Sequence, residues 1–165
     1  IPGEPQPSQK HYDMRIWEQL RGFDPGRPVF VESESKKVGN VTVPESLILA
    51  MRASPCLRVD LSIDERVELL LEDYAWFVQQ PEFFCARLEA LRDLRGASVV
   101  AGWQGKARAG QAREVFRELL ERHYDPGYAS SIRRNFTQFE SAVVLAPRDR
   151  SRQAMDEVAR QMLAQ

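Results

Sequence analysis

The chain has 165 residues, of which 43% are hydrophobic and 28% charged, and its formal net charge is −1. This length and composition suit a single globular domain with a core of its own. The balanced charge excludes attraction to nucleic acid over the whole surface, so any site for a polyanion has to be a local patch. No apolar run approaches the roughly 20 residues of a membrane-spanning helix, so we expect no membrane partner and a cytoplasmic location.

The two cysteines, Cys56 and Cys85, lack the C-x-x-C spacing of metal and redox motifs, and only His11 and His123 could join them in a zinc site. We therefore expect two buried thiols in a reducing compartment. The first residues, Ile1–Pro5, are neither basic nor apolar, so we expect no signal peptide. Because the chain does not begin with Met, we expect a fragment or a processed protein.

The first third of the chain predicts one short helix and one buried strand. Residues 1–12 are rich in Pro and Gln and indicate an irregular lead-in, followed by a helix over 13–20 and a turn at 22–26. Val29–Val31 is an apolar run without alternation, which is typical of a strand buried on both faces in a parallel sheet.

Helices and strands then alternate. Pro44 opens a helix that ends at Ser54-Pro55, and residues 56–61 form a second strand. Ser62-Ile63-Asp64-Glu65 is a capping box, and the helix that it begins carries one apolar stripe from Ile63 to Val78.

The second half is largely helical. Pro81 begins a helix that ends near Gly96. Residues 97–110 are small, glycine-bearing and basic, and no element is assigned to them. Another helix covers 112–123, and Asp125 caps a short helix that runs to about Arg134.

A third strand is expected over 141–146, and Asp149 is expected to cap the last helix. Strands separated by helices favour a parallel sheet and the α/β class. Three strands are few for so many helices, which indicates that a leading strand–helix–strand unit is missing. We expect an irregular lead-in with a short helix over 1–27, a core with a helical insertion over 28–146, and a C-terminal helix over 147–165.

Charged and hydroxyl side chains follow the expected Val29–Val31 strand. Ligands bind at the carboxyl ends of the strands in open α/β sheets, so this loop is a candidate site. A carboxylate here could hold Mg²⁺ through its waters, and the lysines could meet phosphate. The alternative is a solvated loop held by salt bridges. The candidates are Glu32, Ser33, Glu34, Lys36 and Lys37.

Basic and aromatic residues interleave between positions 103 and 136. Such a set can contact RNA phosphates and stack on an unpaired base. The alternative is that the tyrosines pack in the core, the arginines stay in solvent and the histidine only ends a helix. The candidates are Lys106, Arg108, Arg113, His123, Tyr124, Tyr128, Arg133, Arg134, Asn135 and Phe136.

Four strings together resemble one enzyme family. They are Gln-Pro-Ser-Gln at 6–9, Phe-Val-Glu-Ser-Glu-Ser-Lys-Lys-Val-Gly at 30–39, Leu-Glu-Asp-Tyr at 71–74 and His-Tyr-Asp-Pro-Gly-Tyr at 123–128. The chain resembles the C-terminal half of bacterial tRNA 2-selenouridine synthases from residue 2 to about Ala146.

The resemblance implies a transferase that acts on the wobble uridine in the anticodon loop of tRNA. It implies replacement of the sulfur of 2-thiouridine by selenium from selenophosphate, by way of a geranylated intermediate made from geranyl diphosphate. It also implies an upstream rhodanese domain with a catalytic cysteine. The implied fold is a partial P-loop NTPase-like three-layer domain with a mostly parallel sheet, large helical insertions, and its first strand and phosphate loop missing.

The departures from the family pattern limit what this chain can do alone. It has no G-x-x-x-x-G-K-[ST] motif, and Gly102–Ala107 has neither the glycine spacing nor the hydroxyl of a phosphate loop. Neither cysteine lies in a rhodanese-like loop, since Cys56 begins an expected strand and Cys85 lies in an expected helix. We expect the catalytic cysteine and the phosphate loop upstream, and an inactive chain in isolation.

Four further residues are candidates for ligand contact. Gln6, Ser8 and Gln9 precede any expected element and could hydrogen-bond a ligand or cap a neighbouring segment. Arg66 resembles the lid-side arginine of P-loop kinases. Two other functions stay open, namely a P-loop kinase-like phosphotransferase and a truncated, non-catalytic tRNA-binding domain.

Overall fold

The computed structural model describes residues 5–33 and 35–164, which fall into two compact units. The first unit contains the residues up to Cys56 together with Ser131–Ser141, and the second contains Leu57–Ser130 together with the residues from Ala142 onward. None of the described helices is both long enough and apolar enough to cross a bilayer.

The first unit begins with helix α1, Gln9–Gly22. Ser8 is its N-cap, with its Oγ accepting a hydrogen bond from the backbone N–H of His11. The helix therefore starts inside the segment for which an irregular lead-in was expected, because a cap residue and not composition decides where it begins. None of the residues of α1 is buried.

A two-stranded antiparallel hairpin follows, formed by β1, Lys37–Val38, and β2, Val41–Thr42. Gly39 in its two-residue turn has φ +60°, a conformation that glycine adopts without steric cost. Helix α2, Glu45–Ala53, starts directly after Pro44, as expected, and buries Ile48. The 3₁₀-helix η2, Phe139–Ser141, belongs to the same unit.

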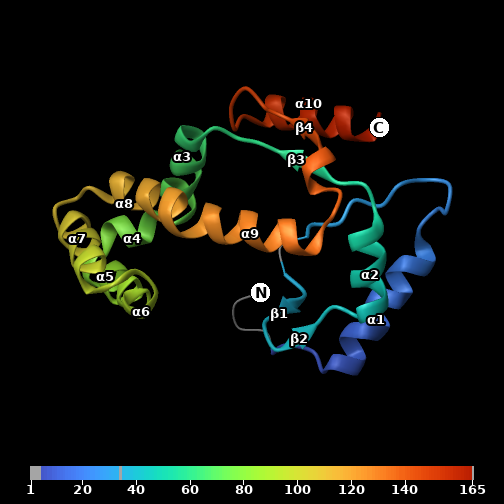
Figure 1. Cartoon of the computed structure of the whole chain (residues 1–165), viewed down its shortest axis with the longest axis horizontal. Helices are drawn as coiled ribbons and strands as arrows, with labels where there is room; N and C mark the ends of the chain where they lie inside the picture. Colours follow the sequence, from blue (N-terminus) through green and yellow to red (C-terminus); the bar gives the residue numbers. More distant parts are fainter. Residues whose placement is uncertain (1–4, 34, 165) are drawn as a thin grey trace. The chain divides into compact units, whose positions relative to one another are not determined.

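The second unit contains a two-stranded parallel sheet (Figure 1). Strand β3, Leu57–Val59, pairs with β4, Val143–Leu145, so that Leu57 lies opposite Val143 and Val59 opposite Leu145. The expected strands at 56–61 and 141–146 and their parallel pairing are confirmed. Helix α10, Arg152–Leu163, follows β4, but Ser151 and not Asp149 supplies its cap.

Helices form the core of the second unit (Figure 1). Five of them contribute buried side chains, and α4 packs Phe77 against this core from its margin. The indole of Trp103 is 1% exposed, and its N–H donates to Glu118 Oε2 at 3.1 Å. The helices in chain order are α3, Ile63–Asp73; α4, Ala75–Gln79; α5, Pro81–Glu89; α6, Arg92–Arg95; α7, Ala97–Arg108; α8, Ala112–Leu119; and the π-helix η1, Leu120–Tyr124.

Two sequence-based expectations about this unit are wrong, and one helix was not predicted. The apolar stripe expected to continue to Val78 is broken at Tyr74, where α3 ends and α4 begins. Residues 97–110 carry the regular helix α7, because Val100, Trp103 and Ala107 bury one face of it despite two glycines. Asp125 caps nothing, since α9, Asp125–Asn135, continues directly from η1.

The expected buried strand at Val29–Val31 is also wrong. These residues form no regular structure, and their exposed fractions are 46%, 43% and 50%. The described residues therefore contain one two-stranded parallel sheet and one hairpin, instead of a three-stranded parallel sheet.

Candidate functional site

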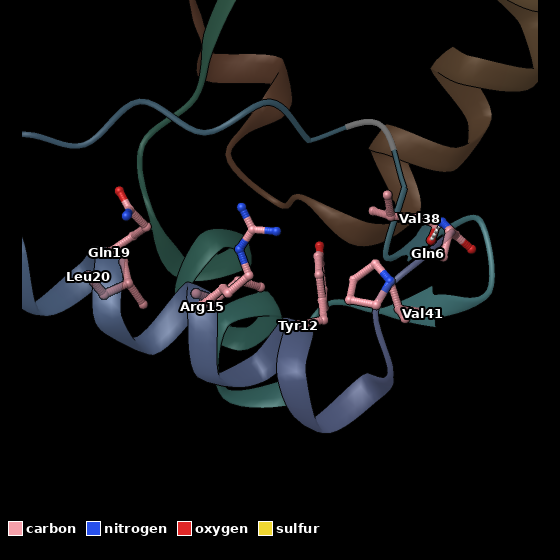
Figure 2. Close-up of a pocket in the computed structure, with 9 residues that line it drawn as sticks. Gln6, Tyr12, Arg15, Gln19, Leu20, Val38 and Val41 are labelled. Atoms are coloured by element: carbon pink, nitrogen blue, oxygen red, sulfur yellow. Dashed lines mark hydrogen bonds between the residues drawn. The ribbon is translucent and has the colours of Figure 1, made fainter. Parts of the chain in front are cut away.

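A groove of about 450 Å³ lies in the first unit, between α1 and the β1–β2 hairpin. Figure 2 shows Tyr12, Arg15 and Gln19 projecting from one face of α1 toward it, with Val38 of the hairpin nearby. Most of the surface is apolar, and one guanidinium lies at the edge. The lining residues are Gln6, Pro7, Tyr12, Arg15, Ile16, Gln19, Leu20, Val38 and Val41.

Two glutamine side chains hold the hairpin next to α1. Gln9 accepts from the N–H of Thr42 at 2.9 Å and donates to the carbonyl of Thr42 at 2.8 Å. Gln6 accepts from the N–H of Asn40 at 2.6 Å and donates to the carbonyl of Val38 at 3.1 Å. Each side-chain amide thus donates one hydrogen bond to the hairpin backbone and accepts one from it, as the backbone of a neighbouring strand would. The same contacts shape the groove, while direct ligand binding by either glutamine stays a prediction.

The acidic segment after Val31 does not follow a strand, because Val29–Val31 forms no regular structure. Glu32, Lys36 and Lys37 are exposed, Ser33 is half-buried, and Glu34 lies outside the described residues. Over the described part of the chain, no three His, Cys, Asp or Glu side chains gather into a set that could hold a metal ion. An Mg²⁺ ion held through its waters by one carboxylate of this loop stays a prediction, and no step is assigned to a metal.

Three basic candidates of the second unit are bound to carboxylates on other helices. The pairs of Arg108 and Arg113 are the more exposed ones, and an exposed ion pair contributes at most about 1 kcal/mol, so a phosphate group could replace either carboxylate at little cost. Glu118, the partner of Lys106, is only 19% exposed. Contact of the three basic residues with RNA stays a prediction. They are Lys106 with Glu118, Arg108 with Glu82 at 2.7 Å, and Arg113 with Glu68.

The candidates at the end of α9 lie in the first unit. Arg133 pairs with Glu140 at 2.6 Å, and the side-chain amide of Asn135 donates to the carbonyl of Ser131 at 2.8 Å. Arg134 is exposed, and Phe136 is 9% exposed. An aromatic ring buried in this way packs inside the protein and presents no open face to a base.

The η1 turn of the second unit brings Arg95, His123 and Tyr124 together. A π-helix is rare and frequently marks a functional site. Arg95 at the end of α6 donates from Nε to His123 Nδ1 at 3.0 Å and from Nη2 to the His123 carbonyl at 3.4 Å. Burial, together with the charge of Arg95, lowers the pKa of His123 below its ordinary value. The ring of Tyr124 lies 4.8 Å from that of His123, edge to face.

Arg66 joins the same region through the first turn of α9. Its two terminal nitrogens reach the two carboxylate oxygens of Asp125 at 2.9 and 2.6 Å, a bidentate geometry. The hydrogen bond to Asp125 raises the pKa of Arg66 above its ordinary value. Tyr124 and Tyr128 are 56% and 49% exposed, so neither tyrosine packs in the core.

Sequence reasoning placed His123, Tyr124 and Tyr128 in one candidate set and Arg66 in another, and the structure brings Arg66 next to the turn that carries His123. It missed Arg95, which lies 28 positions before His123. The only signal in the sequence is a basic residue at a helix end followed by Gly96, and that pattern is common to many helices.

A family model described as the tRNA 2-selenouridine synthase AAA domain matches residues 2–94. The chain belongs to this family. Among curated proteins, the tRNA 2-selenouridine synthase of Cupriavidus necator is 32% identical over 152 residues, covering 75% of this chain and 41% of that protein. The synthase of Hahella chejuensis is 27% identical over 158 residues, covering 78% and 41%.

The family assignment confirms the resemblance seen in the sequence strings. The chain spans about two fifths of the length of these two relatives. No solved structure matches the chain. The AAA-domain match is consistent with a P-loop-like α/β fold, and the parallel β3–β4 pair fits that class.

Proposed function

We propose that the chain is part of a tRNA-modifying transferase that converts 2-thiouridine to 2-selenouridine at the wobble position. The single observation that carries this proposal is the family match over residues 2–94. In this proposal selenophosphate donates the selenium, the reaction passes through a geranylated nucleoside, and a rhodanese domain of the same enzyme carries the reactive cysteine. The chain supplies binding surfaces and not the complete reaction.

We propose the η1 turn and the start of α9 as the tRNA-contact surface. Exposed tyrosines can stack on the unpaired bases of an anticodon loop, and guanidinium groups can pair with its phosphates. Tyr124 and Tyr128 are exposed, and the guanidinium of Arg66 lies at the first turn of α9. The net charge of −1 is compatible with such a surface because the contact is local.

We propose the groove beside α1 as the binding site of the geranyl group. A branched hydrocarbon chain needs an apolar surface, which Ile16, Leu20 and Val41 supply, and its diphosphate needs a cation, which Arg15 supplies at the edge. The groove holds about 450 Å³, within the range of small-molecule sites.

The proposal is tested by exchanging the matching segment of the Cupriavidus necator enzyme for this chain. The hybrid is expressed in cells that lack the enzyme, and tRNA nucleosides are measured by mass spectrometry. We expect 2-selenouridine to appear. A folded hybrid that binds tRNA but forms no modified nucleoside would leave only a non-catalytic tRNA-binding role.

The groove is tested in the same hybrid with Ile16→Glu, and Met14→Glu is its matched control. Both residues lie on α1, but Met14 is 49% exposed and does not line the groove. We expect the geranylated nucleoside to fall at least about tenfold for Ile16→Glu, since a carboxylate in an apolar site is costly, and to stay unchanged for Met14→Glu. Equal effects would contradict the assignment.

The kinase-like alternative has no observation that favours it. It requires an acidic strand end, and Glu32 lies in an exposed, irregular segment. ATP turnover by the intact chain in the absence of tRNA would replace the present proposal.

A further inference from the structure

The contact between Arg95 and His123 determines which ring nitrogen carries the proton. Arg95 Nε–H points at Nδ1 of His123 across 3.0 Å. A guanidinium only donates hydrogen bonds, so Nδ1 has to accept. The imidazole is then neutral with its proton on Nε2. The second contact, from Arg95 Nη2 to the His123 carbonyl, ties the guanidinium to the backbone of η1.

The Nε2 side of the ring is open. Within residues 5–33 and 35–164, no hydrogen bond to this atom is present, and no side-chain nitrogen or oxygen is both buried and without a partner. Nε2 of the half-buried His123 therefore reaches solvent. It can donate to an oxygen that approaches from outside.

Neighbouring groups leave that donor free for a ligand. Two carboxylates lie two positions from His123 along the chain: Asp125, whose two oxygens both accept from Arg66, and Glu121, which lies 3.9 Å from Arg117 Nη1. The charge of Arg95 favours the neutral imidazole over the imidazolium. The exposed ring of Tyr124 lies beside His123, edge to face, and an exposed aromatic ring can stack on an unpaired base.

We propose that Arg95 is a positioning residue that holds His123 as a neutral Nε2–H donor to an oxygen of an unpaired RNA nucleotide stacked on Tyr124. The positioning role rests on the geometry of the turn alone. The RNA acceptor rests on the proposed function. The ligand has to supply an acceptor because a neutral Nε2–H can only donate, and the most numerous acceptors of RNA are its phosphate, ribose and base carbonyl oxygens.

The tautomer is measured on the chain itself by long-range ¹H–¹⁵N NMR of ¹⁵N-labelled histidines. The chain has two histidines, and exposed His11 is the internal reference. We expect the Nε2–H form for His123 and a mixture of tautomers in Arg95→Leu. Arg92→Leu is the matched control, because Arg92 lies on the same short helix but pairs with Glu89. Wild-type His123 in the Nδ1–H form, or an unchanged tautomer in Arg95→Leu, would overturn the proposal.

The acceptor is tested by filter binding of tRNA. We expect His123→Ala and Arg95→Leu each to weaken binding by about tenfold, the upper end for one hydrogen bond. Because the two residues act as one unit, the double variant should bind no more weakly than either single variant. Arg95→Lys keeps the charge without the directed Nε–H and should also bind more weakly, whereas Arg92→Leu should bind normally.

The outcomes separate this inference from the proposed function. Losses that multiply in the double variant would refute the positioning role while leaving tRNA binding intact. A chain that binds no tRNA, although His123 keeps the Nε2–H form, would refute the RNA acceptor and the proposed tRNA surface but not the role of Arg95. The dispersion of the NMR spectrum verifies that each variant is folded.

Discussion

Replacing Trp103 tests whether the helices around it form a real core. The indole is 1% exposed and donates a hydrogen bond to Glu118. Burying about 200 Å² of aromatic surface at about 25 cal/mol per Å² is worth up to about 5 kcal/mol. Measured Trp→Ala changes in cores cost about 3–5 kcal/mol. We therefore expect Trp103→Ala to lower the free energy of unfolding by about 4 kcal/mol, and Trp103→Phe by about 1–2 kcal/mol because most of the volume is kept.

The assay is urea unfolding followed by far-ultraviolet circular dichroism at fixed protein concentration. Trp17→Ala is the control, since Trp17 is 56% exposed on α1 and its loss should change the free energy by less than about 0.5 kcal/mol. Trp103→Phe keeps the test decisive if Trp103→Ala fails to fold. Equal losses at Trp17 and Trp103 would refute the helical core described for the second unit.

Four further outcomes follow from single residues. Gly39→Ala should destabilise the hairpin by about 1–2 kcal/mol because of its positive φ, and its Cβ would lie 2.1 Å from Gln6 Nε2. Gly127→Ala, in open space within α9, should instead stabilise by up to about 1 kcal/mol. In thermal unfolding, a stabilised Gly39→Ala would contradict the first prediction and a destabilised Gly127→Ala the second. The pKa of His123 is lower in the folded chain than its ordinary value, so as the pH drops the unfolded chain takes up a proton at His123 before the folded chain does. The free energy of unfolding should therefore fall as pH drops through about 6.5. His123→Gln should flatten that decline between about pH 7.5 and about pH 5.5 in urea titrations, and an identical slope would contradict the assignment. Arg108→Ala should change the free energy of unfolding by less than about 1 kcal/mol, because its ion pair is exposed.

Local patterns predicted much of the second unit. Ser62 caps α3 as expected, with its Oγ accepting from the N–H of Glu65 at 3.3 Å, but the carboxylate of Glu65 accepts from Arg150 and not from the backbone of Ser62. The two segments expected as strands, at 56–61 and 141–146, form the parallel pair β3–β4. Helix α7 was not predicted, although Val100, Trp103 and Ala107 have a helical spacing. The segment also contains two glycines and basic residues, and these do not by themselves indicate a buried helix.

Long-range contacts decided what the sequence could not predict. Val29–Val31 has the composition of a buried strand, but burial requires a partner, and the described residues offer none to it. Gln6 and Gln9 looked like ligand-binding amides, and their bonding to the hairpin spans more than 30 positions. The role of Arg95 depends on a contact across 28 positions, which no local pattern encodes.

The central claim is that this chain itself contacts the unpaired part of tRNA through the η1 turn. The most direct measurement is competition for labelled tRNA between an anticodon stem-loop and a fully paired RNA hairpin stem of equal charge. Since stacking on Tyr124 needs an unpaired base, the stem-loop should displace tRNA at a concentration about tenfold or more below that of the paired stem. Equal displacement by both RNAs, or no binding of tRNA even at low salt, would contradict the account.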